Sequence, residues 1–196
     1  MASVRYRPRD DGKGTETEFL IRHLERLSLG TPYPAVVEHV ASLVGQVNAK
    51  LADDAPQGGS HDTPWLVVDA TGVGTPVCDE LRKALAGQRV QISEAVFTAG
   101  EKLDVNPRIR RVSVAKMGMV ARLQTLLAWR RIRLPNTAMA RELADELKAF
   151  EIRAAGASEV AGAFRVGSHD DLVVALGLAT LDGARSVYED RGLFYV

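Results

Sequence analysis

The feature that most constrains this chain is a continuous apolar run, Trp65-Leu66-Val67-Val68, which ends directly in Asp69. A strand with no polar side is typical of a sheet that is covered on both faces. The following stretch, Asp69-Ala70-Thr71-Gly72-Val73-Gly74-Thr75-Pro76, predicts a tight turn into a helix that ends near Ala86. A strand, a turn and a helix in this order predict the α/β class.

The flanking segments continue this alternation. Apolar patterns predict strands at residues 19–27, 90–98 and 111–114, and a short extended piece at 131–134. Helices are predicted from Pro32-Tyr33-Pro34 to Leu51, from Lys116 to Trp129, after an Asn136 cap, and from His169, behind a Ser168 cap, to about Val187. Short strands are expected at 151–154 and 163–166, and a surface loop at 52–63. We therefore expect one central sheet flanked by helices, in a single domain spanning residues 1–196 with its core at 15–187.

The composition suits a domain of this size. The chain has 196 residues, 46% of them apolar, with 25 Lys+Arg against 25 Asp+Glu. A disordered chain would be poorer in apolar residues and would carry more net charge. The lone Cys78 excludes a disulfide scaffold and a cysteine-based zinc site, and suits a reducing compartment. Without an apolar signal-peptide core or an apolar run of about 18 residues, we expect a cytoplasmic protein.

The zero net charge hides an uneven distribution. The segment from Lys102 to Pro135 has nine basic residues and one acid, Asp104, so it carries +8. The rest of the chain has 16 basic and 24 acidic residues and carries −8. Such a segment can form a phosphate-binding surface. The alternative is that its arginines lie on separate solvated faces.

Two acidic positions are candidates for chemistry. Asp69 follows a buried strand, and ligands of open α/β sheets gather beyond the carboxyl ends of strands. Asp170 and Asp171 begin an apolar helix, next to His169. Oxygen ligands from separate segments are what Mg²⁺ requires. The structural alternatives are that Asp69 caps its own turn and that the paired acids favour a helix N-terminus.

Other chemistries find little support. Gly72-Val73-Gly74 lacks the third glycine of a dinucleotide motif and the Gly-Lys-Ser/Thr of a P-loop. The histidines have no zinc-binding spacing. Cys78 lies within a predicted helix without an obvious histidine partner, and no serine elbow is present. We therefore expect neither nucleotide binding nor a covalent hydrolase.

A series of segments resembles the C-terminal nuclease domain of phage large terminase subunits. One of them, Leu66-Val67-Val68-Asp69-Ala70-Thr71-Gly72-Val73-Gly74, is similar to the second acidic strand and turn of that family. Further pieces follow the family's order between Phe19 and Ala179. They are residues 22–34, Lys116 with 120–127, 131–135, Glu142 to Glu151, and 169–176.

This resemblance implies an RNase H-like fold, with a mixed central sheet, and Mg²⁺- or Mn²⁺-dependent cutting of concatemeric viral DNA during packaging. By carry-over, Asp69 and Asp171 would be metal ligands and catalytic residues, with Asp170 as neighbour or substitute. Two such ions about 4 Å apart can activate water and stabilise the leaving oxygen. Lys116, Arg110, Arg111 and Arg122 become candidate contacts to double-stranded DNA. The implied partners are the terminase small subunit, the portal or a separate ATPase chain, in the cytoplasm of a bacterial host.

The chain departs from the family in two respects. It has no Walker motif and is too short for the family's ATPase domain. It also lacks the first strand with its catalytic Asp, for which Asp10, Asp11, Glu16 and Glu18 are the available stand-ins. We therefore expect an N-terminally truncated domain with an open sheet edge. Three hypotheses follow: a nuclease, a non-catalytic DNA- or partner-binding prophage remnant, and an α/β protein whose edge drives dimerisation.

Overall fold

The computed structural model describes residues 2–8, 15–55, 63–71, 74–98, 104–106, 111–156 and 170–181, which form five helices and two sheets. These residues fall into two compact units, which are described here one at a time. The first unit contains the chain up to Arg26 and from Ala115 through the last described helix. The second unit contains Leu27–Thr98 and the strands that follow, up to Val114.

The sheet of the first unit has the order β1-β2-β7. Strands β1 (Ala2–Pro8) and β2 (Thr15–Ile21) form an antiparallel hairpin. The short β7 (Ile132–Arg133) joins the other edge of β2 in parallel, with Phe19 opposite Ile132. The backbone N–H of Phe19 donates to the carbonyl of Arg131 at 2.7 Å and extends this pairing.

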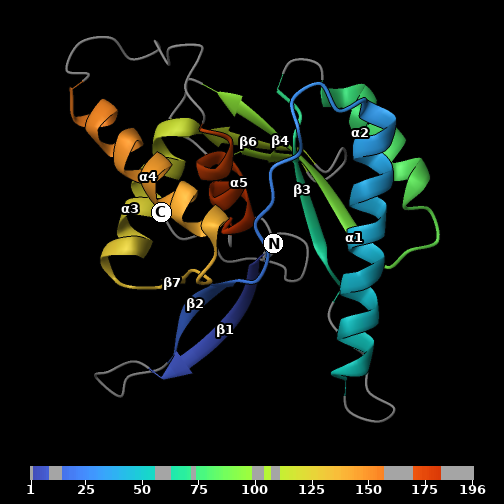
Figure 1. Ribbon diagram of the computed structural model, residues 1–196, viewed down its shortest axis with the longest axis horizontal. Helices are drawn as coiled ribbons and strands as arrows, with labels where there is room; N and C mark the ends of the chain where they lie inside the picture. Colours follow the sequence, from blue (N-terminus) through green and yellow to red (C-terminus); the bar gives the residue numbers. More distant parts are fainter. Residues whose placement is uncertain are drawn as a thin grey trace. The chain divides into compact units, whose positions relative to one another are not determined.

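Three helices complete the first unit, α3 (Lys116–Ala128), α4 (Ala138–Gly156) and α5 (Asp171–Ala179) (Figure 1). Their apolar side chains bury one core with β2 and β7. Its buried members are Phe19, Ile21, Val120, Leu123, Leu126, Ile132, Leu143, Leu172, Val173 and Leu176. Helix α5 buries most of its surface, as expected for a helix that is apolar nearly all round.

The second unit contains a sheet of order β3-β4-β6-β5. The strands are β3 (Trp65–Asp69), β4 (Gln91–Thr98), β5 (Asp104–Asn106) and β6 (Arg111–Ala115). Strands β3 and β4 run parallel, from Trp65 opposite Gln91 to Asp69 opposite Ala95, whereas β5 and β6 are antiparallel. The carboxyl end of β3 therefore lies beside the middle of a neighbouring parallel strand.

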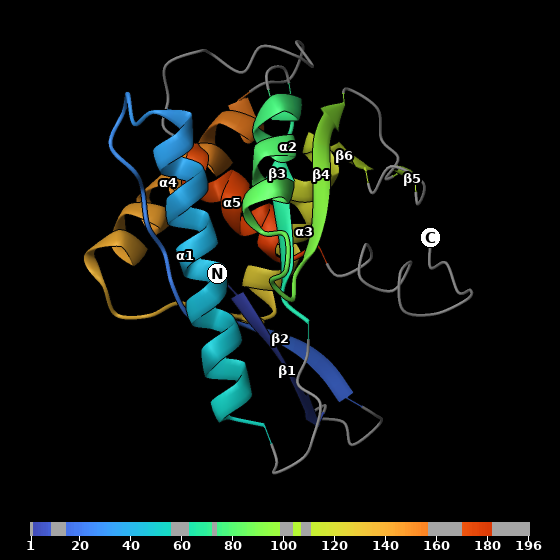
Figure 2. The ribbon, with the colours of Figure 1, turned by 90° about the vertical axis from the view of Figure 1, so that its right-hand side faces the viewer.

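Helices α1 (Tyr33–Asp53) and α2 (Gly74–Ala84) pack on each other, and α2 packs on β3 and β4 (Figure 2). Pro34 lies in the first turn of α1, where a missing N–H costs nothing. The core between these elements consists of Val37, Val44, Leu81, Leu85 and Ile92. Val37 and Val44 are the buried residues of α1, and they are about two turns apart on the same face of the helix.

The α/β class is confirmed, but several expectations are wrong for the described residues. The strands form two sheets instead of one central sheet, because β2 pairs with β1 and β7 while β3 pairs with β4. The first predicted strand ends at Ile21 instead of continuing to residue 27. Residues 151–154 continue α4, because Glu, Ile, Arg and Ala extend a helix without a breaker. The expected strand at 163–166 and the Ser168 cap lie outside the described residues.

Within the described part of the chain, no helix combines the length and the apolarity needed to cross a bilayer.

Candidate functional site

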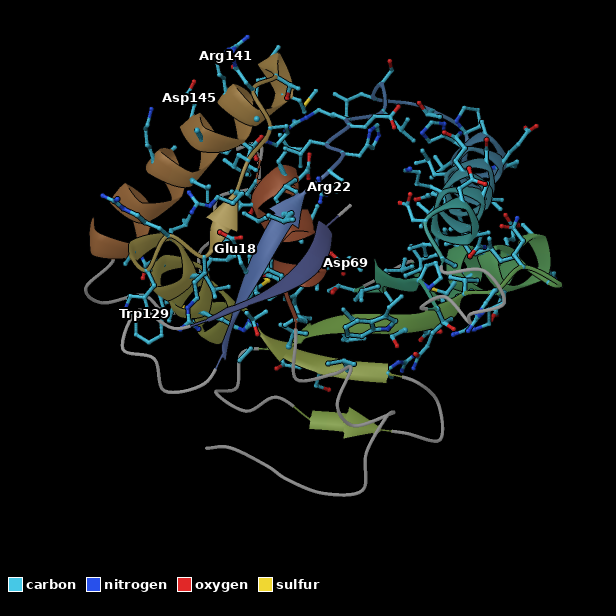
Figure 3. The ribbon with its side chains drawn as sticks, turned by 90° about the horizontal axis from the view of Figure 1, so that it is seen from below. Glu18, Arg22, Asp69, Trp129, Arg141 and Asp145 are labelled. Atoms are coloured by element: carbon cyan, nitrogen blue, oxygen red, sulfur yellow. The ribbon has the colours of Figure 1, made fainter. Side chains whose placement is uncertain are left out.

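Asp69 ends β3 in the second unit, with its side chain exposed (Figure 3). Its Oδ1 accepts the backbone N–H of Thr71 at 2.9 Å, which is the turn-capping bond of the structural alternative. The Thr71 hydroxyl in turn accepts the backbone N–H of Phe97 at 3.0 Å and ties the turn to β4. The carboxylate is thus held at the rim of the sheet, and one oxygen is used by the turn.

Asp170 and Asp171 lie at the start of α5 in the first unit. Asp170 occupies the N-cap position, but its side chain makes no capping bond. Its Oδ2 instead accepts from Lys116 Nζ at 3.1 Å, in an ion pair whose members are both about a quarter exposed. Asp171, with 73% of its side chain exposed, lies 3.7 Å from Arg26 Nη1. The structure thus joins Lys116, a candidate DNA contact, to a candidate metal ligand.

Glu146 supplies the cap that Asp170 does not provide. Its Oε2 accepts the backbone N–H of Leu172 at 3.2 Å, in the first turn of α5. Its Oε1 accepts from Arg26. A carboxylate near a helix N-terminus is stabilised by the helix dipole. Sequence reasoning missed this role, because Glu146 belongs to α4 and no local pattern joins it to α5.

The other candidate DNA contacts have internal partners as well. Arg111 donates to Glu94 Oε2 from Nε at 3.1 Å and from Nη2 at 2.8 Å. Arg122 lies over the ring of Phe19, at 5.7 Å from its centroid. Arg110 lies outside the described residues. The basic segment is divided between the two units, so the described residues do not establish it as one surface.

Glu94 is the most unusual charged residue of the second unit. Its side chain is 5% exposed on β4, and it pairs with Arg82 as well as with Arg111. Burial alone would raise the pKa of Glu94, but the hydrogen bonds from the two arginines hold it below its ordinary value. The neighbouring Cys78 is fully buried, and burial with the Glu94 charge raises the pKa of its thiol. Cys78 is therefore a core residue without nucleophilic character.

Glu18, one of the possible stand-ins for a first catalytic acid, is fully buried on β2. Its Oε1 accepts from Arg133 Nε at 2.7 Å, across to β7. This bond gives Glu18 a structural role in the sheet. The Glu16 side chain, Asp10 and Asp11 lie outside the described residues.

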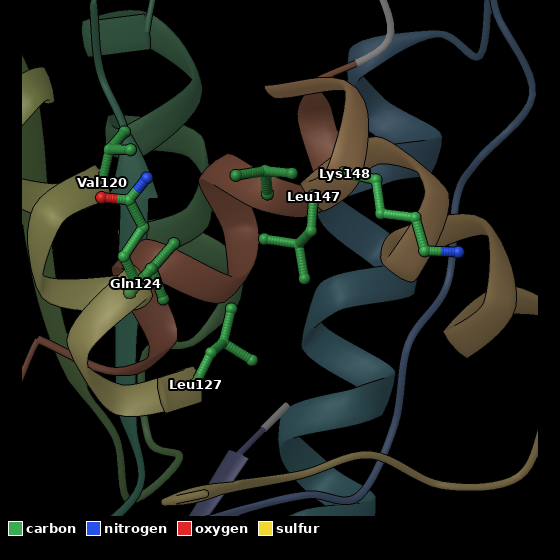
Figure 4. Close-up of a pocket in the computed structure, with 7 residues that line it drawn as sticks. Val120, Gln124, Leu127, Leu147 and Lys148 are labelled. Atoms are coloured by element: carbon green, nitrogen blue, oxygen red, sulfur yellow. The ribbon is translucent and has the colours of Figure 1, made fainter. Parts of the chain in front are cut away.

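A pocket of about 190 Å³ lies between α3, α4 and α5 (Figure 4). It is lined by Val120, Leu123, Gln124, Leu127, Leu147, Lys148 and Val173. The lining is largely apolar and includes none of the candidate acids. The pocket is therefore separate from the predicted chemistry.

The metal prediction can be tested within each unit. Among the described residues, no three His, Cys, Asp or Glu side chains come close enough to hold a metal ion together. Asp69 belongs to the second unit, whereas Asp170 and Asp171 belong to the first. The exposed carboxylates of Asp69 and Asp171 have the oxygen chemistry that a hard divalent cation requires. A shared site built from them stays a prediction.

Comparison with known proteins adds no relative. No protein-family model, curated protein or solved structure matches this chain. The resemblance to the terminase nuclease therefore depends on the ordered motifs alone. Of those motifs, the apolar strand that ends in Asp69 and the helix that begins at Asp171 have the secondary structure that the resemblance implies.

Proposed function

We propose that this chain is a divalent-metal-dependent DNA endonuclease domain of the phage terminase type, with an RNase H-like fold. The observation that carries the proposal is the position of Asp69. It is an exposed carboxylate at the carboxyl end of a strand that lies in parallel beside β4. In α/β proteins this edge is where ligands bind.

In this proposal Asp69 and Asp171 are the ligands of Mg²⁺ or Mn²⁺, with Asp170 as neighbour. When bound, the cation supplies an activated water and stabilises negative charge on the leaving oxygen. The turn bond to Thr71 would orient Asp69, and the Glu146 cap would fix the first turn of α5 below Asp171. Lys116 would hold the Asp170 side chain in place through their ion pair, which is a positioning role.

The sheet order leaves one edge of β3 without a partner strand among the described residues. Strand β3 is at the end of the order and pairs, among the described strands, with β4. The terminase resemblance expects the first acidic strand on the other side of β3. Double-stranded DNA is the proposed substrate, in the cytoplasm of a bacterial host, with the small subunit, the portal or a separate ATPase chain as proposed partners.

The test is incubation of the purified chain with supercoiled plasmid in Mn²⁺. We expect nicked and linear products, and we expect both Asp69→Asn and Asp171→Asn to abolish them. Asp145→Asn is the matched control, because Asp145 is an exposed acid of α4 whose partner is Lys148. Cleavage that survives Asp69→Asn would show the assignment to be wrong.

A second candidate is a non-catalytic module that binds DNA or a packaging partner. It is favoured by the ion pair between Lys116 and Asp170 and by the lack of a three-acid group among the described residues. This candidate predicts salt-sensitive DNA binding that Asp69→Asn leaves unchanged, and no cleavage by the folded parent in Mn²⁺.

A further inference from the structure

The turn that ends α3 has an uncommon residue at its critical position. The C-cap of the helix is Trp129, and Arg130 follows with a φ of +54°. The N–H of Arg130 donates to the carbonyl of Leu127 at 2.9 Å, and the N–H of Arg131 donates to that of Leu126 at 2.8 Å. This pair of bonds defines a Schellman motif.

The residue with positive φ in this motif is usually glycine, because a Cβ atom is strained there. Arg130 instead carries a long side chain, which is exposed. A basic residue near a helix C-terminus is favoured by the helix dipole, but that benefit does not require the left-handed position. The arginine therefore adds charge at a site where the backbone alone would favour glycine.

Trp129 adds an aromatic surface to the same turn. It is 59% exposed, and the guanidinium of Arg131 lies over its ring at 4.8 Å from the centroid. Figure 3 shows Trp129 beyond the end of α3. Within five residues the chain thus presents an exposed indole and three arginines, Arg130, Arg131 and Arg133. Arg133 is paired with the buried Glu18, which fixes the chain after the turn.

We propose that Trp129, Arg130 and Arg131 form a contact site for single-stranded nucleic acid. An unpaired base would stack on the face of the Trp129 indole that Arg131 does not cover, and the exposed guanidinium of Arg130 would bind a flanking phosphate. Aromatic side chains next to basic ones are the combination that binds single strands without regard to sequence. In a duplex the bases are already stacked on each other, so this site favours unpaired bases.

The surroundings of Trp129 favour nucleic acid over an anionic membrane, another surface that attracts tryptophan and arginine. Gln124 and Thr125, in the preceding turn of α3, are exposed and polar, and the following Ile132 is buried. Membrane attachment at an interface requires a broad apolar face, whereas base stacking requires one ring.

The experiment measures binding of a fluorescein-labelled 20-nucleotide oligothymidylate by anisotropy, at low salt and in EDTA. We expect Trp129→Ala to weaken binding at least about fivefold, and Trp129→Phe to retain most of it. Arg130→Gly preserves the Schellman motif, so it stays folded. It should weaken binding and reduce the slope of log K against log salt by about 0.7.

Two matched controls separate this site from general surface effects. Met117→Ala removes an apolar side chain that is 61% exposed at the other end of α3, and Arg141→Gln removes an exposed arginine of α4. Both should bind like the parent. Equal binding by Trp129→Ala and Met117→Ala would overturn the proposal. It would also be overturned by equal affinity for a duplex, or by binding to phosphatidylserine vesicles without binding to the oligonucleotide.

Binding of single strands at Trp129 is independent of the proposed nuclease activity. Because binding is measured without metal, Asp69→Asn should leave it unchanged. If the plasmid is not cleaved but the oligonucleotide is bound, only the proposed nuclease activity is refuted. If the plasmid is cleaved but the oligonucleotide is not bound, only the proposed stacking site is refuted.

Discussion

Thr137, rather than the expected Asn136, is the N-cap residue of α4. The Thr137 hydroxyl accepts the backbone N–H of Ala140 at 3.2 Å, three residues into the helix. Asn136 instead accepts from the side chain of Arg141 at 3.2 Å. Both residue types are good caps, and they are adjacent, so the sequence pattern alone does not distinguish them.

This assignment predicts unequal effects of two neighbouring substitutions. Thr137→Ala should lower the free energy of unfolding by about 1 kcal/mol, because it leaves a helix N–H without its partner. Asn136→Ala removes one exposed contact and should cost less than about 0.5 kcal/mol. Urea denaturation of both variants checks this, and equal losses would contradict the assignment.

Glu94 provides a second test at the residue scale. Glu94→Gln should lower the free energy of unfolding by about 2 kcal/mol at pH 7, because charge-assisted bonds to Arg82 and Arg111 are lost. The folded pKa of Glu94 lies below its ordinary value of 4.5. Its stabilisation is therefore complete above that value and is lost as the pH falls through the folded pKa.

The difference in stability between the parent and Glu94→Gln should consequently shrink in acid. Urea denaturation at pH 7 and near pH 3 measures it. Glu38→Gln, at an exposed position of α1, is the control and should show little effect at either pH. A difference that stays constant in acid would mean that the Glu94 charge does not stabilise the fold.

At the scale of elements, the long periodic segments were predictable and the pairings were not. The helix α1 and the strand β3 follow from local sequence pattern. The prediction that β3 is covered on both faces is not met, because Trp65 to Val68 are only half-buried. The partner of β2 does not follow from local pattern, because Ile132 contributes a two-residue strand with no periodicity of its own.

In the candidate site, too, local features could be predicted from the sequence, whereas contacts between distant segments could not. Asp69 and Asp171 could be found from sequence, because each adjoins an apolar run at a strand or helix end. Glu146 and the pairs Glu18–Arg133 and Glu94–Arg111 join distant segments, so only the tertiary structure shows them.

Helices α3 and α5 approach closely at Gly177. A Cβ added there would lie 2.3 Å from the Sδ atom of the buried Met119, whereas one added at Gly118 would meet Ala115 at an ordinary 3.7 Å. Gly118→Ala should raise stability by up to about 1 kcal/mol. Gly177→Ala should be less stable than Gly118→Ala by about 1–3 kcal/mol, because Met119 must move. Thermal denaturation of the two variants checks this, and equal melting temperatures would show that the helices are not packed this closely.

At the scale of the whole molecule, the balance of charge has a consequence for solution behaviour. Because the 25 basic and 25 acidic residues cancel at pH 7, electrostatic repulsion between copies is weakest there. Light scattering of a concentrated sample should therefore be highest near pH 7 and should fall toward pH 9. Scattering that rises steadily toward pH 9 would contradict this expectation.

The parallel pairing of Phe19 with Ile132 also sets an order of events on the ribosome. These partners are 113 positions apart, and the second unit is encoded almost entirely between them. At a translation rate of about 5–20 residues per second, β7 is synthesised about 6–23 s after β2. Until then, the free edge of β2 in the β1–β2 hairpin has no partner strand. During that interval, the nascent chain carries a β-edge of the kind that promotes association between strands. Slow codons within residues 27–114 would lengthen this interval and increase the demand for chaperones.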